Sequence, residues 1–177
     1  YEEERNDLNL TGIGKLINLI FKDVPYKLSF EPGRYLVAKS GIIITKIINV
    51  KKNHVVNFLI TDAGMQTLLR PAMYNANHRV AELNKKDCES VNYTIAGPIC
   101  ESSDIIKKDV SLSKQKIGDY LIIKDVGAYG AVMASNYNSR GLPTEILINK
   151  EKYEVIREEE KISTILKKDI IPSWLED

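Results

Sequence analysis

Apolar side chains recur at helical spacing near the start of the chain, over residues 10–21. This spacing predicts an amphipathic helix whose apolar stripe packs on a neighbouring layer. The segment Asp23-Val24-Pro25 ends the helix, because proline disfavours a helical conformation in the residue before it. Residues 27–31 then read as a short strand that stops at Pro32-Gly33. One helix followed by one strand is a single step of an α/β fold, and it needs further layers to bury its faces.

The pattern changes after residue 34 to short runs of Ile, Val, Tyr and Leu bounded by Gly, Asn, Asp and Pro. Such runs are typical of strands, and six or more of them with few helices predict a closed or sandwiched antiparallel β domain. The expected elements are strands at 35–38, 42–51, 55–61, 79–83, 92–96, 119–126, 145–148 and 153–156, short helical segments at 65–69 and 131–135, and a helix at 159–168. We therefore divide the chain into an α/β remnant, 1–34, and a mainly β domain, 35–177.

Charge and composition narrow the classes of partner. Lys and Arg total 25 and Asp and Glu total 24, so the net charge of +1 gives no electrostatic basis for binding nucleic acid or a membrane surface. The cysteines, Cys88 and Cys100, do not form a disulfide framework, and no set of His, Cys and acidic residues has metal-site spacing. The sequence begins with Tyr rather than Met and lacks a signal peptide. We expect a cytoplasmic protein and interpret the chain as part of a longer polypeptide.

Two clusters hold arginines that could bind an anion. In residues 31–34, E-P-G-R, a tight turn exposes backbone N–H groups, and Arg34 adds a fork-shaped donor suited to carboxylate or phosphate. Glu31 can accept a hydrogen bond from a protonated ring nitrogen. In the second cluster the following proline should hold Arg70 extended, and Tyr74 supplies a rigid hydroxyl. Taken singly, the clusters also fit a surface turn with a weak ion pair and an edge segment with a solvated arginine.

Two further clusters hold a thiol and a phenol at predicted strand ends. Cys100 stands beside Glu101 on a turn, where a thiol can donate a proton. Tyr129 lies between small residues in G-A-Y-G, which leaves its phenol free to reach a phosphate or carboxylate. The plainer alternatives are a buried, inert thiol and a core tyrosine whose hydroxyl is satisfied by backbone. All four clusters together favour a small anionic ligand with more than one acidic group.

The order and spacing of these motifs resemble the diaminopimelate decarboxylases, within the pyridoxal-phosphate-dependent ornithine, diaminopimelate and arginine decarboxylases. The motifs that carry the resemblance are E-P-G-R at 31–34, D-A-G-M at 62–65, R-P-A-M-Y-N-A-N-H at 70–78, G-P-I-C-E-S-S-D at 97–104, G-A-Y-G at 127–130 and Y-N-S-R at 137–140. The resemblance extends from residue 1 to about residue 168. The E-P-G-R turn and the Cys-acid pair also fit ornithine-type enzymes, whereas the segments at 70–78 and 137–140 favour diaminopimelate.

The resemblance implies a fold and a reaction. The family has a (β/α)8 barrel that holds the cofactor, followed by a β domain like the C-terminal domain of alanine racemase. Residues 1–34 would then be the last helix and strand of the barrel. The expected reaction converts meso-2,6-diaminopimelate to L-lysine and CO2 with pyridoxal 5'-phosphate. The cofactor would be bound by Glu31 at its pyridine nitrogen, and by Gly33, Arg34 and Tyr129 around its phosphate.

The resemblance also implies roles at the substrate. The carboxylate at the distal, non-reacting end would be held by Arg34, Arg70, Tyr74 and Tyr129. Glu101 would pair with the distal ammonium group, and Cys100 would protonate Cα after CO2 leaves. In the family the last two residues act in the site of the partner subunit, which implies a homodimer.

No lysine in this sequence stands in the context of the family's cofactor-bearing lysine, which forms a Schiff base from the first strand of the barrel. We therefore expect the 177 residues alone to be inactive. Two alternatives stay open, namely a dimerising β module without catalysis and a related ornithine- or arginine-type decarboxylase. A racemase on the same fold is disfavoured, since a Cys-Glu pair and two arginines suit a diacid better.

Overall fold

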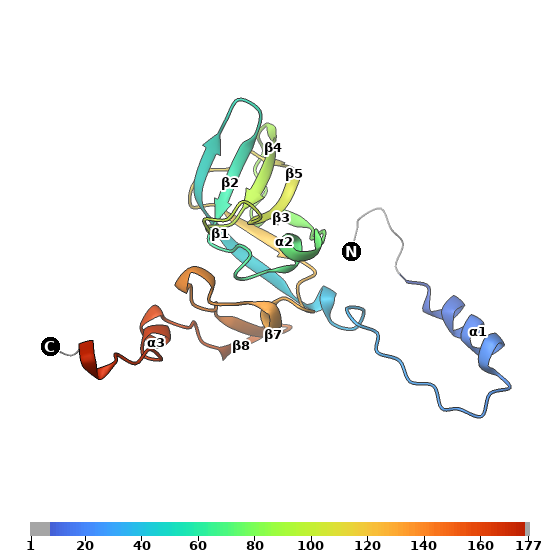
Figure 1. The fold of residues 1–177 in the computed structure, drawn as a ribbon. Coiled ribbons are helices and arrows are strands. Elements are labelled where there is room, and N and C mark those ends of the chain that lie inside the picture. The colour runs from blue at the N-terminus through green and yellow to red at the C-terminus, as the bar shows by residue number, and fades with distance from the viewer. Residues whose placement is uncertain (1–7, 176–177) are drawn as a thin grey trace.

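The chain folds into a six-stranded sheet, with a hairpin and short helices outside it (Figure 1). The computed structural model describes residues 8–175. The sheet consists of β1 (Ile42–Lys52), β2 (Asn57–Thr61), β3 (Val80–Glu82), β4 (Ser90–Ala96), β5 (Ile105–Ser113) and β6 (Tyr120–Lys124), in the order β3-β6-β1-β2-β4-β5. The hairpin is β7 (Glu145–Asn149) with β8 (Lys152–Arg157), and the helices are α1 (Leu10–Phe21), α2 (Arg70–Tyr74) and α3 (Ile162–Leu166). No helix within residues 8–175 has the length and apolarity needed to cross a membrane.

Strand β1 allows the sheet to curl, because it changes its partner along its length. Its first half, residues 42–46, pairs with β6, and its second half pairs with β2. The register shifts between Ile47 and Asn49, and a bulge of this kind bends a strand and increases its twist. The outer strands β3 and β5 are thereby brought close together, and the sheet is a nearly closed barrel.

The strand directions place alternate connections at opposite edges of the barrel. All pairs in the sheet are antiparallel except β2 with β4, which is parallel and was not predicted. Strands β1, β3 and β5 therefore begin at the edge where β2, β4 and β6 end. We call this the site edge, and it carries residues 34–41, 62–79, 97–104 and 125–130. The opposite edge carries residues 53–56, 83–89 and 114–119.

The barrel is filled by aliphatic side chains from alternate strand positions. Five of them are fully buried, with no exposed surface: Ile47, Leu59, Ile95, Leu121 and Ile123. Burying one such side chain contributes on the order of 1.5–3 kcal/mol. Tyr93 also belongs to this core. Its hydroxyl has a hydrogen-bond partner there, because it accepts from the backbone N–H of Gln115 at 3.1 Å.

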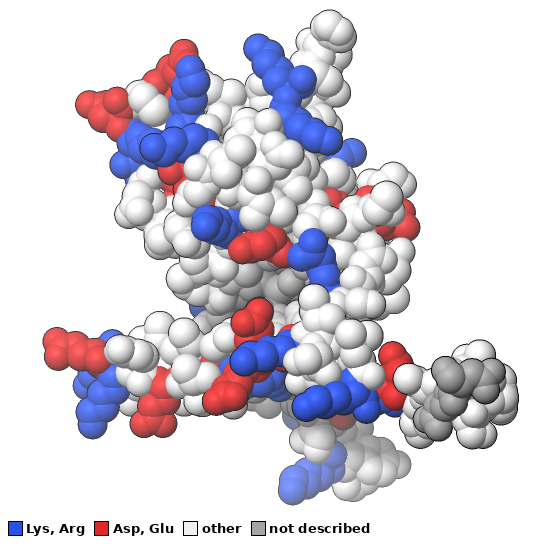
Figure 2. Space-filling view, turned by 90° about the vertical axis from the view of Figure 1, so that its left-hand side faces the viewer, with Lys and Arg blue, Asp and Glu red and all other residues white. Residues whose placement is uncertain are grey.

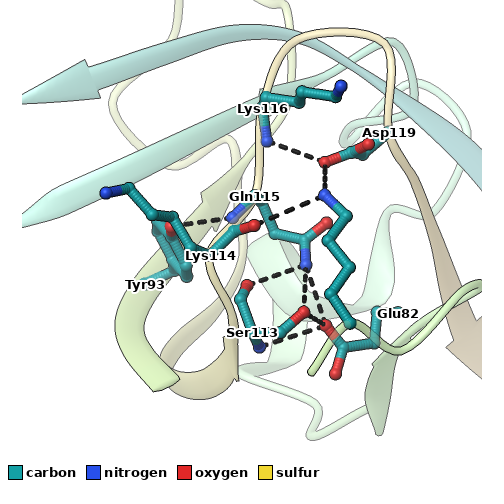
Figure 3. Close-up of polar contacts among 8 residues, drawn as sticks. Glu82, Tyr93, Ser113, Lys114, Gln115, Lys116 and Asp119 are labelled. Carbon is teal, nitrogen blue, oxygen red and sulfur yellow. Dashed lines mark hydrogen bonds and ion pairs between the residues drawn. The ribbon is translucent and has the colours of Figure 1, made fainter. Parts of the chain in front are cut away.

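Side chains close the seam between the outer strands β3 and β5 (Figure 3). One carboxylate oxygen of Glu82 accepts hydrogen bonds from the Ser113 amide at 3.1 Å, from Gln115 Nε2 at 2.8 Å and from the Ser113 hydroxyl. Nearby, Asp119 accepts a hydrogen bond from the Lys116 amide at 2.8 Å and forms an ion pair with Lys86. Glu82 thus joins the two outer strands where the opposite edge closes.

Most of the predicted elements are confirmed, but two predicted strands are wrong. Residues 27–31 form no strand, because no other strand within residues 8–175 lies beside them to complete a ladder. They belong to the segment that joins α1 to the start of β1, and this segment lies outside the barrel (Figure 1). Residues 35–38 turn instead of extending, since the Ala38 amide donates to the Arg34 carbonyl at 3.0 Å. A short 3-10 helix, Ala38–Ser40, follows directly.

Three other features differ from the prediction. Strand β5 was missed because Lys107, Lys108 and Asp109 interrupt its apolar pattern, and Asp109 has a φ of 56°. Helix α3 is shorter than the predicted 159–168. Helix α1 forms as predicted, but its apolar stripe packs on no neighbour within the described residues, and Leu19 remains 70% exposed.

Candidate functional site

The polar residues singled out in the sequence from position 34 onward lie on the connections of the site edge. Arg34 precedes β1, Arg70 and Tyr74 lie between β2 and β3, and Tyr129 follows β6. Cys100 and Glu101 occupy the connection from β4 to β5. The strand directions therefore gather segments up to about a hundred residues apart along one rim. The resemblance implied that these residues act at one site, whereas their spacing alone did not, because the grouping depends on the parallel pairing of β2 with β4.

Three of these residues are in direct contact. The guanidinium carbon of Arg70 lies 5.2 Å from the centroid of the Tyr74 ring and 5.3 Å from that of the Tyr129 ring. Each such cation–π contact is worth about 0.5–1 kcal/mol at a partly exposed site. No hydrogen bond or ion pair within residues 8–175 involves this guanidinium, and its Nε is buried without a partner. Arg70 thus presents an unneutralised positive charge between two phenol rings.

The local structure of Arg70 differs from the prediction. Arg70 is the first residue of helix α2 and is not extended, so the expected effect of Pro71 on its backbone is wrong. Proline is tolerated in the first turn of a helix, where its missing N–H would have no partner anyway. Asn75 ends the helix in the left-handed conformation and returns its N–H to the Arg70 carbonyl. This single turn orients both Arg70 and Tyr74 toward the Tyr129 loop.

The loop that carries Tyr129 is strained and closely packed. Tyr129 adopts a φ of 59°, which is uncommon and costly for a residue other than Gly, Asn or Asp. A Cβ atom at Gly127 would overlap the Val37 carbonyl oxygen, and the Gly127 amide donates to the Ala38 carbonyl at 3.0 Å. The plainer reading of Tyr129 as a core residue is wrong, since the side chain remains 43% exposed.

A second pair of contacts fixes the segment that follows α2. Arg79 makes a two-point contact with Asp125, from Nε at 3.0 Å and from Nη2 at 3.2 Å. The His78 Nδ1 lies 3.0 Å from the Lys124 carbonyl oxygen. Burial lowers the pKa of His78, and the positive charge of Arg70 lowers it further. These contacts hold the ends of β3 and β6 together beneath the Arg70 cluster.

The Cys100 loop is shaped by Asp104, whose role the sequence did not reveal. The Asp104 carboxylate accepts hydrogen bonds from the Met65 amide at 2.6 Å and the Ile99 amide at 2.8 Å. Burial raises the pKa of Asp104, against the lowering effect of these two donors. A Cβ atom at Gly97 would collide with the carboxylate, so the glycines in this motif make room for it. The signal in the sequence was an acid three residues after Glu101, with glycines in both loops that it joins.

Cys100 and Glu101 are both exposed at this rim, and neither contacts Arg70. The alternative of a buried, inert thiol is therefore wrong. Glu101 makes only long contacts of 3.4 Å, with the Ser102 hydroxyl and the Ser103 amide of its own loop. The structure thus leaves a thiol and a carboxylate available at the site edge.

The E-P-G-R turn stands apart from the Arg70 cluster. Glu31 and Gly33 are exposed, Arg34 is half-buried, and Gly33 has a φ of 60°. The Ala38 backbone links this turn to the Tyr129 loop, because its amide donates to the Arg34 carbonyl and its carbonyl accepts from the Gly127 amide. Arg34 makes further interactions of its own.

Charged side chains of both signs share the face of the molecule shown in Figure 2. On the face shown in Figure 2, basic and acidic side chains are interspersed and neither sign dominates. No group of three metal-binding side chains gathers within residues 8–175. At the site edge, Arg70 and Glu101 each carry a charge for which no ion pair is found within residues 8–175.

Comparisons with known proteins agree with this layout. A model of the C-terminal sheet domain of pyridoxal-dependent decarboxylases matches residues 34–127. The chain is 44% identical over 150 residues to a diaminopimelate decarboxylase of Archaeoglobus fulgidus, a match that covers 84% of this chain and 36% of that protein. It is 39% identical over 159 residues to the diaminopimelate decarboxylase of Escherichia coli K12, which covers 83% of this chain and 38% of that protein.

Solved structures show the same relationship. The diaminopimelate decarboxylase of Methanocaldococcus jannaschii superposes with a TM-score of 0.91 at 39% identity, over 99% of this chain and 41% of that one. The same protein in complex with L-lysine gives a TM-score of 0.89 at 38% identity. The chain thus spans about two fifths of the length of these relatives. The chain belongs to the pyridoxal-dependent decarboxylase family, and residues 34–127 match its C-terminal sheet domain.

Proposed function

We propose that the complete protein that carries this chain is a cytoplasmic decarboxylase of meso-2,6-diaminopimelate that produces L-lysine and CO2. The chain's contribution is recognition of the distal end of the substrate. The observation that carries this proposal is the Arg70 guanidinium, which lies between Tyr74 and Tyr129 without an anionic partner in the described residues. The relatives that share these segments, at 44% and 39% identity, are diaminopimelate decarboxylases.

The geometry of Arg70 suits a carboxylate. A guanidinium binds a carboxylate through two parallel N–H groups, and the flanking rings restrict the plane in which those groups lie. The Tyr74 and Tyr129 hydroxyls can donate to the same ligand. Arg34, on the same rim, would supply a second positive charge. An amino acid whose distal end carries a carboxylate matches this set better than ornithine or arginine, which have none.

Glu101 and Cys100 would act on the rest of the substrate. Glu101 would pair with the distal ammonium group, so that the end bearing both charges is held away from the reacting carbon. Cys100 would deliver the proton to Cα, since its thiol is exposed on a loop made rigid by Asp104. Neither residue contacts the Arg70 cluster of its own chain, and we therefore assign both to the site of a partner subunit in a homodimer.

The family's cofactor, pyridoxal 5'-phosphate, fits the residues of this chain in part. The Gly33 turn has open space where a Cβ would stand, and the Tyr129 phenol is accessible, so both can approach a phosphate. Arg34 would assist there, and Glu31 would face the pyridine nitrogen. The cofactor supplies the electron sink for loss of CO2. The chain's own residues orient the substrate, spare its distal carboxylate and return a proton.

We assign residues 1–34 to the end of a (β/α)8 barrel in the complete protein and residues 35–177 to the β domain. The uncovered apolar stripe of α1 supports this division, because a helix in such a barrel buries that face. The chain covers about two fifths of its relatives, so the 177 residues alone should not release CO2. Turnover by the isolated chain would contradict this part of the proposal.

The direct test measures CO2 release by the complete protein with pyridoxal 5'-phosphate. We expect turnover of meso-diaminopimelate, and little of ornithine or arginine. Glu101→Gln should raise KM for diaminopimelate by about 10- to 100-fold, as expected for losing one charged contact, and leave cofactor affinity unchanged. Glu89→Gln, an exposed glutamate on the opposite edge, is the matched control. A preference for ornithine or arginine would show that the substrate is wrong, and equal loss of cofactor and substrate binding would contradict the role of Glu101.

A further inference from the structure

His78 is a buried imidazole with one satisfied nitrogen and one unsatisfied nitrogen. The residue is only 3% exposed. Its Nδ1 lies 3.0 Å from the Lys124 carbonyl oxygen, and a carbonyl only accepts, so the proton is on Nδ1. Its Nε2 then carries a lone pair, and this atom is buried with no hydrogen-bond partner within residues 8–175. In this tautomer, His78 Nε2 is an acceptor for which residues 8–175 provide no donor.

The surroundings of His78 favour the neutral ring. Burial lowers the pKa of His78, and the charge of Arg70 lowers it as well. The hydrogen bond to Lys124 and the charge of Asp125 act in the opposite direction. Asp125 is itself engaged by Arg79, through a two-point contact at 3.0 and 3.2 Å. Burial has the largest effect and the charge of Arg70 adds to it, so the surroundings favour the uncharged imidazole.

A complementary donor belongs to Arg70. Arg70 Nε–H is also buried without a partner, and so is the acceptor oxygen Oε1 of Gln66. An unpaired buried polar group costs about 1–3 kcal/mol, so native proteins pair such groups or bridge them with ordered water. A buried water that joins two or three polar groups satisfies one donor and two acceptors at once.

A neutral partner has a specific consequence for Arg70. A carboxylate at this position would satisfy Nε–H but would also neutralise the guanidinium charge. An imidazole satisfies the same N–H and leaves the positive charge for an incoming anion. It also holds one side of the guanidinium, whose carbon lies 5.2 and 5.3 Å from the centroids of the Tyr74 and Tyr129 rings. The remaining N–H groups of Arg70 are then oriented before the ligand binds, so that ordering this side chain adds little entropic cost to binding.

We propose that His78 is the positioning residue for Arg70, and that its neutral Nε2 holds Arg70 Nε–H through one ordered water. The guanidinium is thereby presented, oriented and fully charged, to a carboxylate on the ligand. This inference rests on the proposed role of Arg70 in the function above. It adds a residue that does not itself touch the substrate.

The protonation state and tautomer of the His78 ring can be tested without an activity assay. The 177-residue chain has two histidines, so its imidazole nitrogen signals can be assigned with His54→Gln as the reference variant. At pH 7 we expect nitrogen NMR to show His78 as a neutral ring protonated on Nδ1. An imidazolium at pH 7, or a proton on Nε2, would overturn the inference even if the enzyme is active.

Two substitutions distinguish a role in positioning Arg70 from a role in stability alone. Each keeps one of the two hydrogen-bonding functions of the imidazole and removes the other. In His78→Asn, the side-chain amide can still donate to the Lys124 carbonyl, but the acceptor toward Arg70 is lost. In His78→Gln, the amide oxygen takes the place of Nε2, and the bond to Lys124 is lost. The complete protein with each change is assayed for KM, kcat and thermal midpoint with meso-diaminopimelate.

We expect His78→Asn to raise KM by about tenfold, the effect of losing one hydrogen bond to a charged group, with kcat within about threefold of the unmodified enzyme and little change in thermal midpoint. His78→Gln should lower the thermal midpoint and leave KM near its original value. If KM follows the thermal midpoint in both variants, His78 is merely structural and the inference fails. If the unmodified protein does not act on diaminopimelate at all, the proposed function fails, and the NMR result alone decides the state of His78.

Discussion

The two edges of the barrel differ in how completely their buried polar atoms are paired. At the opposite edge, Glu82 and Asp119 each accept several hydrogen bonds from neighbouring backbone and side chains (Figure 3). At the site edge, three buried polar atoms lack partners within residues 8–175: Gln66 Oε1, Arg70 Nε and His78 Nε2. Buried polar groups are almost always satisfied in native proteins. The unpaired atoms of Arg70, His78 and Gln66 thus lie at the edge where we propose that the substrate binds.

The backbone shows the same contrast. At the site edge Asn75, Asp125 and Tyr129 have φ values of 51°, 63° and 59°, although none is a glycine. In the opposite-edge connections, the only described residue with such a φ is Gly118, which adopts it at no steric cost. Asn and Asp adopt this conformation readily, so Tyr129 is the strained residue of the three, at a cost of about 1–3 kcal/mol. Tyr129 and the three unpaired atoms thus lie at the same rim.

The exposed cysteines give the sharpest comparison, because one lies at each edge. Cys100→Ala should lower kcat of the complete enzyme by about 10²- to 10³-fold, as expected for losing a positioned proton donor, without a change in thermal midpoint. Cys88→Ala, in the connection from β3 to β4, should leave both quantities unchanged. The steady-state rate of CO2 release is the measurement. Equal effects of the two changes would mean that the Cys100 thiol takes no part in the reaction.

Glu82 tests whether the opposite edge is structural. Glu82→Ala removes the acceptor of the Ser113 amide and hydroxyl, and one of the three acceptors of Gln115 Nε2, so we expect a loss of about 2–3 kcal/mol in unfolding free energy. Glu89→Ala removes only an exposed ion pair with Lys114 and should cost less than about 0.5 kcal/mol. Urea unfolding of the chain gives both values. A similar, small cost for the two changes would show that the β3–β5 seam does not depend on Glu82.

Asp104 gives a smaller effect, which depends on pH. Burial raises its pKa in the folded state, so the folded protein binds this proton more tightly than the unfolded chain. Its contribution to stability is therefore fully present below the unfolded pKa of about 3.9 and declines as pH rises through the folded pKa. Relative to Asp104→Asn, the unmodified protein should lose stability between about pH 4 and neutrality. A stability difference that is constant over this range would contradict the raised pKa.

The sequence predicted the fold where local pattern decides it. The helix at α1 and strands such as β1 and β4 follow from spacing and β-branched content. Strand β5 was missed because Lys107 and Lys108 interrupt its pattern, and only pairing with β4 makes it a strand. Residues 27–31 show the converse, since a strand-like pattern forms no strand where no partner lies beside it.

The residues of the candidate site were predicted from residue type and from the resemblance, but the strand order that groups them was not. Arg70, Tyr74 and Tyr129 were identified by residue type and motif, and the structure places the arginine between the two rings. The roles of Asp104 and His78 were not identified. Both depend on contacts with residues about 40 positions away, at Met65 and at Lys124. Such contacts follow from strand order, which no local pattern encodes.

The central claim is that Arg70 recognises the carboxylate at the distal end of the substrate. Its most direct test compares inhibition of the complete enzyme by L-lysine, which has this carboxylate, with inhibition by cadaverine, which lacks it. The ratio of the two inhibition constants is measured in the unmodified enzyme and in Arg70→Met, which keeps an unbranched side chain without the charge. We expect L-lysine to bind at least about 100-fold more tightly in the unmodified enzyme, as losing a paired charge costs roughly 2–5 kcal/mol, and this preference to fall to within about threefold in Arg70→Met. A preference that survives the substitution intact would show that the distal carboxylate is recognised elsewhere.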